Sequence, residues 1–138
     1  LPPQCKVISC ESGLKKLVPG EICYCVMARA DTNEGGRQIH ASVGLAIPKE
    51  DTNWGYLSEV HGYGMNQQEA ADMAEDLAAG MLGTTLGLEV DPNQAWSEKE
   101  QVYMSSGLII RTSNVTQTAR GQSDVWTTVV AIAMFLFD

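Results

Sequence analysis

The amino-acid sequence predicts an α+β domain, in which mostly antiparallel strands pack against one main helix. Alternating apolar residues favour strands in the first half of the chain, one capped segment has helical spacing, and the last segment is almost continuously apolar. With 138 residues and 44% hydrophobic content, the chain can form one core but not two ordinary domains. We therefore expect a single domain over residues 1–138.

The first part of the chain predicts two strands joined as a hairpin. A short strand is possible at residues 6–9, and the apolar run within residues 21–30 predicts a longer one. Residues 31–36 are polar and glycine-bearing, which indicates a turn. Residues 38–47 alternate as a second strand, with one face formed by Ile39, Ala41, Val43 and Leu45. Two strands with a short glycine-bearing loop between them are typical of a hairpin.

A third strand is predicted over residues 54–63, after Pro48 ends the second. Alternate residues of a strand point to the same side, so Glu59 shares a face with His61. Tyr56, Ser58, Val60 and Gly62 would then occupy the opposite face.

The clearest helix follows this strand. Asn66 with Glu69 three positions on is a capping-box pattern, and Gly83 or Gly87 is a plausible end. Between them a methionine-rich apolar stripe has helical spacing and should pack against a sheet; its members are Ala70, Met73, Ala74, Leu77, Ala78, Met81 and Leu82.

Two more strands are expected after Pro92, over residues 101–112 and 125–137. The apolar run at 129–137 is far shorter than the roughly 20 residues that span a bilayer, so we interpret it as a strand buried on both faces. The pair Ser105-Ser106 lies inside a strand-like run, which favours a polar strand face over a self-processing site.

Bulk properties narrow the classes of partner. A net charge of −8 and a pI near 4.6 argue against nucleic acid or an anionic membrane as the partner. The front of the chain has no signal-peptide pattern, so we expect a cytoplasmic protein with reduced thiols. Cys5-x4-Cys10 and Cys23-x-Cys25 could form a metal site or two disulfides, but we expect no metal site; Cys23 and Cys25 should be small buried hydrophobes.

The search for chemistry isolates one residue. The sequence contains no Ser-His-Asp order, P-loop or Rossmann glycine pattern. Glu59 is a carboxylate in a strand of aromatic, aliphatic and small residues. Apolar surroundings raise the pKa of a carboxyl group, which lets it donate a proton near neutral pH. The alternative is that Glu59 lies on a solvent-facing stripe of a half-buried strand, with His61 as an exposed neighbour.

Several segments, in order, resemble one enzyme family. They are Leu1-Pro2-Pro3, Leu17-Val18-Pro19-Gly20, the stretch 41–49, Gly55-Tyr56-Leu57-Ser58-Glu59 and the helix that Glu69-Ala70 begins. Together they resemble the larger subunit of pyruvoyl-dependent arginine decarboxylases. The resemblance extends from the front of the chain through the helix, whereas residues 91–121 are longer than the archaeal pattern.

The resemblance implies a fold, a cofactor and a reaction. In that family a proenzyme cuts itself between two serines, which leaves a pyruvoyl group capping the larger subunit; here it would lie one or two residues before Leu1. A Schiff base between this group and L-arginine leads to agmatine and CO2, and Glu59 matches the glutamate that protonates the α-carbon. The agmatine could serve polyamine biosynthesis or acid resistance.

The resemblance also implies partners. A small subunit from the same proenzyme should carry the acid that binds the guanidinium group, within a layered α/β sandwich that assembles as a trimer of paired subunits. Two other interpretations stay open. One is a pyruvoyl-dependent decarboxylase of another amino acid, such as histidine or aspartate. The other is a non-enzymatic oligomeric binding module of the same fold.

Overall fold

The computed structural model describes the chain except for residues 3–4, 50–53, 88–95, 98–101, 106–107 and 138. Its elements, in chain order, are α1 (Cys10–Leu14), β1 (Cys25–Thr32), β2 (Gln38–Pro48), β3 (Tyr56–Tyr63), α2 (Gln67–Thr85), β4 (Trp96–Ser97), β5 (Val102–Ser105), β6 (Leu108–Arg120) and β7 (Thr127–Met134). The described strands form a β1–β7 ribbon and a five-stranded sheet in the order β3-β2-β6-β5-β4. Their pairings are antiparallel, which confirms the α+β class.

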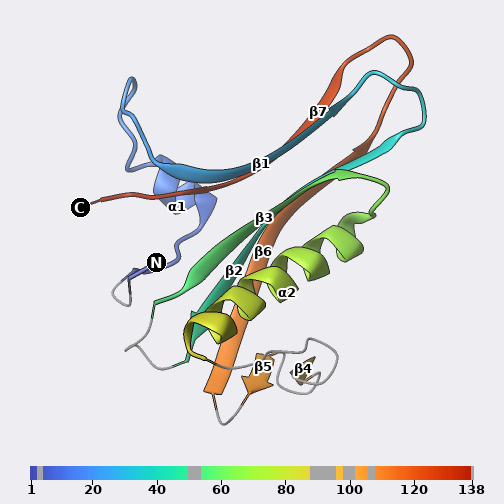
Figure 1. The fold of residues 1–138 in the computed structure, drawn as a ribbon. Coiled ribbons are helices and arrows are strands. Elements are labelled where there is room, and N and C mark those ends of the chain that lie inside the picture. The colour runs from blue at the N-terminus through green and yellow to red at the C-terminus, as the bar shows by residue number, and fades with distance from the viewer. Residues whose placement is uncertain (3–4, 50–53, 88–95, 98–101, 106–107, 138) are drawn as a thin grey trace.

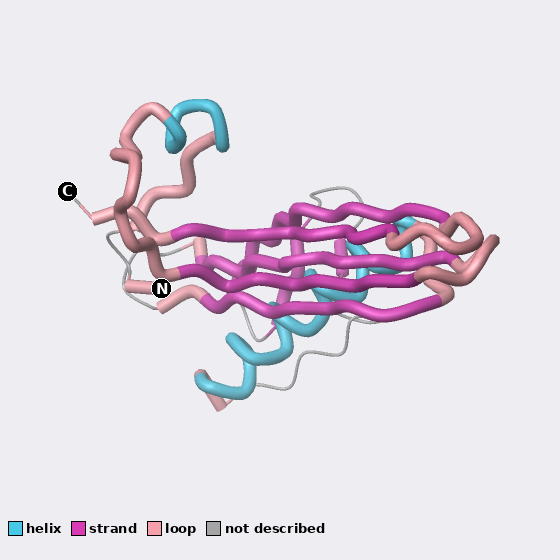
Figure 2. Tube along the Cα trace, turned by 90° about the horizontal axis from the view of Figure 1, so that it is seen from above, coloured by secondary structure: helices cyan, strands magenta, loops and turns pink. Residues whose placement is uncertain are grey.

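The five-stranded sheet is covered on both faces. Figure 1 shows α2 along one face and the β1–β7 ribbon over the other, and Figure 2 shows the long strands of both sheets from above. One buried cluster fills the space under the ribbon: Ala28, Ala30, Ile39, Ala41, Val43, Val129 and Ala131. A second lies under the helix: Ala46, Ala78, Ala79, Leu82 and Ile110. Strand β2 contributes to both clusters because successive side chains point to opposite faces.

The predicted hairpin between the first two strands is wrong. β1 pairs with β7, whereas β2 pairs with β3 on one edge and β6 on the other. Both edges of β2 are therefore occupied, and β1 packs against its face instead. The turn after β1 carries the chain from one sheet to the other. Gly36 in this turn has a φ of +81°, which glycine adopts readily because it has no Cβ.

Strand boundaries also differ from the sequence prediction. β1 begins at Cys25 rather than Glu21, and Ile22 and Tyr24 are exposed. The possible strand at residues 6–9 does not form; the Ser9 side chain instead accepts a hydrogen bond from the Ser12 backbone nitrogen and caps α1. The strand predicted over residues 101–112 becomes β5 and β6, and residues 101 and 106–107 lie outside the described part. Ser105 ends β5, while Ser106 is one of the residues not described.

Helix α2 begins and ends as expected, and its buried face overlaps the predicted stripe only in part: Ala70, Ala74, Ala78 and Leu82 are buried as predicted. The Asn66 side chain caps its start, and Gly87 follows its end with φ +72°, whereas Gly83 is a buried residue inside the helix. The buried positions are mainly alanine: Ala70, Ala71, Ala74, Ala78, Ala79, Leu82 and Gly83. Met73, Leu77 and Met81 from the predicted stripe are exposed, whereas Ala71, Ala79 and Gly83 are buried in their place.

The last strand is covered on one face in the single chain, not on both. In β7, Val129 and Ala131 belong to the buried cluster between the ribbon and the five-stranded sheet, while Val130, Ile132 and Met134 are exposed. The cysteine prediction needs a similar correction, because Cys23 is half-buried and Cys25 is exposed. All four cysteines are free thiols. None of the helices in the described part of the chain has the length and apolar character needed to cross a bilayer.

Candidate active site

The candidate site lies on β3, an edge strand of the five-stranded sheet. Its side chains alternate as the sequence predicts. Leu57 packs against the core under the ribbon, whereas Tyr56 packs against the core under α2. Glu59 and His61 follow Leu57 at intervals of two and so share its face. Val43 lies across from Glu59 and Ala41 across from His61 on β2.

Glu59 and His61 form a half-exposed pair. The nearest distance between them, from His61 Nδ1 to Glu59 Oε1, is 4.0 Å. Their side chains are 49% and 54% exposed, respectively. Leu57 and the buried Val43 lie beside Glu59, but the single chain does not enclose the carboxylate, which lies on the half-exposed side of β3 as in the alternative interpretation. Both groups can therefore reach solvent or a bound molecule.

Ser58 anchors β3 from behind. Its hydroxyl donates a hydrogen bond of 2.5 Å to the carbonyl oxygen of Ala74 in α2. This buried contact holds the strand against the helix at the residue before Glu59, so the Glu59 side chain must project to the opposite face. The sequence alternation predicted this direction, but the helix contact that fixes it was not predicted.

The front of the chain joins the same strand. The Leu1 nitrogen donates to the Gly55 carbonyl oxygen at 2.9 Å, and the Gly55 nitrogen donates to the Leu1 carbonyl oxygen at 2.8 Å. Two residues that exchange both bonds form an antiparallel pair. A Cβ at position 55 would lie 2.8 Å from the Ala46 carbonyl oxygen, so glycine is needed for the close approach of this residue to β2. The pairing brings Leu1 to the strand that carries Glu59.

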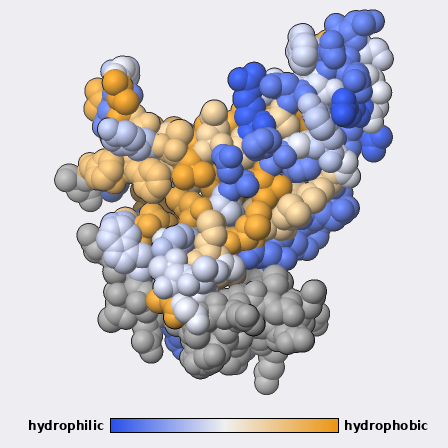
Figure 3. Space-filling view, in the orientation of Figure 1, coloured by the Kyte–Doolittle hydropathy of each residue, from blue (hydrophilic) through white to orange (hydrophobic). Residues whose placement is uncertain are grey.

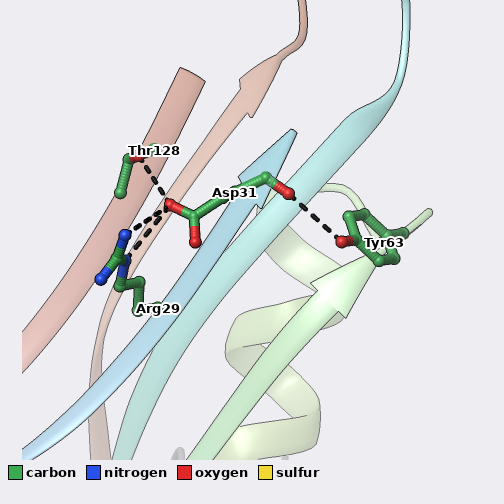
Figure 4. A network of polar contacts seen from close by, with 4 residues as sticks. All are labelled: Arg29, Asp31, Tyr63 and Thr128. Carbon is green, nitrogen blue, oxygen red and sulfur yellow. Dashed lines mark hydrogen bonds and ion pairs between the residues drawn. The ribbon is translucent and has the colours of Figure 1, made fainter. Parts of the chain in front are cut away.

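A network of polar contacts lies at the Tyr63 end of β3. Arg37 stacks over the Tyr63 ring at 3.8 Å, and the Tyr63 hydroxyl donates to the Asp31 carbonyl oxygen at 3.2 Å. Figure 4 shows that Asp31 also accepts hydrogen bonds from Arg29 and Thr128 through its carboxylate. Sequence analysis missed this group, because its members come from three strands and a turn.

His40 was also missed as a residue of interest. It lies on β2 across from Gly62, only 3% exposed, and its Nδ1 has no hydrogen-bond partner among the described residues. Burial, and then the nearby His61, lower the pKa of His40, while Glu69 opposes the shift. The sequence did not indicate that His40 is buried, because a histidine within a strand can be buried or exposed, depending on which elements pack on it.

No group of three or more potential metal-binding side chains is found in the described ranges. The site therefore consists of one carboxylate with a neighbouring imidazole, placed near the front of the chain. Such an arrangement can donate or accept a proton at a molecule held beside β3.

Comparison with known proteins identifies the family. A family model described as pyruvoyl-dependent arginine decarboxylase matches residues 1–138. The chain belongs to the pyruvoyl-dependent arginine decarboxylase family. A probable pyruvoyl-dependent arginine decarboxylase of Chlorobium limicola is 55% identical over 135 residues, which cover 98% of this chain and 75% of the relative.

Other pyruvoyl-dependent arginine decarboxylases are similarly close. The probable enzyme of Chloroherpeton thalassium is 54% identical over 136 residues, covering 98% of this chain and 75% of the relative. The pyruvoyl-dependent arginine decarboxylase 2 of Methanosarcina mazei is 50% identical over 137 residues, or 99% of this chain and 75% of the relative. The similarity therefore includes residues 91–121, beyond the stretch where the sequence motifs carried the resemblance. Membership of the family implies a covalently bound pyruvoyl group.

Proposed function

We propose that this chain is the single-domain larger subunit of an enzyme that converts L-arginine to agmatine and CO2. The family match and the names of the relatives support the reaction. The observation that carries the proposal is the pairing of Leu1 with Gly55, which directly precedes β3 and lies four residues before Glu59. It connects the expected cofactor-bearing end of the chain to its candidate proton donor.

The residues around Leu1 fit a pyruvoyl group attached ahead of it. The Leu1–Gly55 pair is antiparallel, so a chain that keeps this direction would run along the free edge of β3 toward Glu59. Strand alternation has a period of two. Of the two positions proposed for the group, the second ahead of Leu1 would therefore share the face of Glu59. When present, a pyruvoyl group supplies a ketone that accepts the electrons released as CO2 leaves.

In this proposal Glu59 provides the proton for the substrate α-carbon. Its side chain projects from an anchored strand and is exposed enough to meet a bound molecule. On the same face, Leu57 and the buried Val43 connect this part of β3 to the core under the ribbon. The chain offers no described acid placed for the guanidinium group, in keeping with a specificity residue on the small subunit.

We further propose a small subunit released from the same proenzyme by self-cleavage, a layered α/β sandwich and a homotrimer of paired subunits. The support is the apolar surface that the single chain leaves exposed. On the outer face of the ribbon it includes Met27, Val130, Ile132 and Met134, and on α2 it includes Met73, Leu77 and Met81. Figure 3 shows hydrophobic residues gathered over the middle of the molecule, away from the hydrophilic region at its upper right. Apolar patches of this kind mark interaction surfaces.

A cytoplasmic location completes the proposal. The cysteines are free thiols, which fits a reducing compartment.

Mass spectrometry of the purified full-length gene product tests the cofactor. We expect two chains, with the larger one blocked to Edman sequencing; one chain with a free amine contradicts the cofactor proposal. Borohydride reduction with arginine should then trap a covalent adduct on the larger chain. Histidine or aspartate in place of arginine tests the other substrates, and the absence of any adduct would favour a binding module.

Substitution tests the role of Glu59. Glu59→Gln should slow CO2 release from arginine by about 10²-fold or more, because the amide cannot donate the proton. Glu11→Gln is a matched control, since Glu11 is an exposed carboxylate on α1 that pairs with Lys15 just beyond the helix. Near-normal turnover by the Glu59 variant would remove this residue from the mechanism.

A further inference from the structure

A proton donor that acts once per turnover must be recharged. Loss of CO2 from arginine replaces the bond between the α-carbon and the carboxyl carbon with a C–H bond, so each agmatine carries one proton taken from the enzyme. If Glu59 supplies it, the side chain is left as a carboxylate and needs another proton before the next cycle. A group that lies beside Glu59 and communicates with solvent can return this proton, in competition with water at the half-exposed carboxylate.

His61 meets both requirements. It lies two residues from Glu59 on the same face of β3, with its Nδ1 4.0 Å from Glu59 Oε1. That distance is longer than a hydrogen bond, so a small side-chain rotation or one bridging water completes the contact. With 54% of its side chain exposed, the imidazole also meets solvent. Histidine is the side chain whose ordinary pKa best suits proton exchange near neutral pH.

Other charged groups around His61 have partners of their own. Arg37 lies over the Tyr63 ring and forms an ion pair with Glu34 at 3.0 Å. The Asp31 carboxylate is held by Arg29 and Thr128 (Figure 4). Behind β3, His40 on β2 is buried; burial, and then the nearby His61, lower the pKa of His40, while Glu69 on α2 opposes the shift. Glu59 is therefore the acid positioned to exchange a proton with His61.

We propose that His61 is a positioning residue for Glu59, which orients its carboxyl group and returns to it the proton consumed in each turnover. The inference rests on the proposed role of Glu59. In the donation step the Glu59 O–H bond breaks and the substrate C–H bond forms. In the recharging step an N–H bond of the His61 imidazolium breaks and the Glu59 O–H bond re-forms. The neutral imidazole then takes a proton from water or buffer, so one proton enters from solvent per CO2 released.

Buffer rescue separates a proton relay from a structural role. The test uses self-processed enzyme from the full-length gene, with turnover expressed per pyruvoyl-bearing subunit. His61→Gln should lower kcat by about 10-fold or more in dilute buffer, with KM nearly unchanged. Added imidazole should restore much of the loss, while wild-type kcat should not respond to buffer concentration. The variant should retain the wild-type thermal midpoint, because the replaced side chain is half exposed.

A double variant tests whether His61 acts through Glu59. Glu59→Gln combined with His61→Gln should be no slower than Glu59→Gln alone, because a relay has no effect without the group it recharges. Imidazole should rescue neither. Additive losses of kcat in the double variant would overturn the relay. So would a His61→Gln variant with a raised KM at normal kcat, or one whose kcat does not respond to imidazole. Normal kcat in His61→Gln alongside a slow Glu59→Gln would overturn it and leave the proposed function standing. A fully active Glu59→Gln would instead remove the proposed proton donor itself.

Discussion

Ser58 and Ala74 fix the spacing between the sheet and its helix. The Ser58 hydroxyl donates a 2.5 Å hydrogen bond to the Ala74 carbonyl oxygen, and Gly44 lies directly beside this contact on β2. A Cβ added to Gly44 would fall inside contact distance of both the Ala74 carbonyl group and the Ser58 Oγ. The helix backbone thus rests almost on the sheet, which explains why α2 buries alanines rather than its methionines.

Gly44→Ala should therefore destabilise the protein. The added methyl group meets backbone atoms that cannot move without lifting α2, so we expect a loss of about 1–3 kcal/mol in the free energy of unfolding. Urea titration followed by circular dichroism measures it. Gly80→Ala is the matched control, because nothing lies within 4 Å of the Cβ position in the helix. That change should stabilise α2 by about 0.5–1 kcal/mol. Equal effects of the two substitutions would contradict the close approach.

Asn66→Ala should weaken the start of α2. The Asn66 Oδ1 accepts a 2.9 Å hydrogen bond from the Glu69 backbone nitrogen, which otherwise lacks a partner within the helix. We expect a loss of about 1 kcal/mol in unfolding free energy, measured by thermal or urea denaturation. Asn66→Asp keeps an acceptor in place and should retain most of the stability. If both variants matched wild type, the cap would contribute nothing.

His40 should make the fold sensitive to acid. Burial lowers the pKa of His40 in the folded chain, so between that value and the ordinary 6.5 the unfolded chain binds more protons. Its contribution is complete above about pH 6.5 and is lost as the pH falls through the folded pKa. We therefore expect His40→Gln to flatten the fall in unfolding free energy between about pH 7 and pH 5. An unchanged slope would show that other groups set the acid limit.

Thr128 should control the titration of Asp31. Its hydroxyl donates a 2.7 Å hydrogen bond to the Asp31 Oδ1. This bond is the largest cause that lowers the pKa of the Asp31 carboxyl group; Arg29 lowers it further, while partial desolvation opposes the shift. Thr128→Val should move the Asp31 pKa upward, as measured by NMR titration of the carboxyl carbon. Because a lowered pKa favours the folded state above the unfolded value of about 3.9, the variant should lose stability at neutral pH relative to pH 2. Arg29→Gln should produce a smaller upward movement.

Local pattern predicted the elements of the site better than their partners. The alternation that put Glu59 beside His61 survives folding, because the side-chain period of a strand does not depend on what pairs with it. The Asn66 cap is equally local, since its hydrogen bond spans three residues. The hairpin failed for the opposite reason. Which edges β1 and β2 use is decided by β7, β3 and β6; Cys25 in β1, for example, pairs with Met134, 109 positions later in the chain.

The sequence alone thus determined the α+β class, the strand that carries Glu59, the capped helix and, through its motifs, the family. These depend on periodicity and on short-range hydrogen bonds, which neighbouring residues dictate. Tertiary structure alone decided that Leu1 pairs with Gly55, that His40 is buried and that one face of β7 stays exposed. Such features depend on which distant surfaces meet, and the free energy of packing selects that arrangement only once the whole chain has folded.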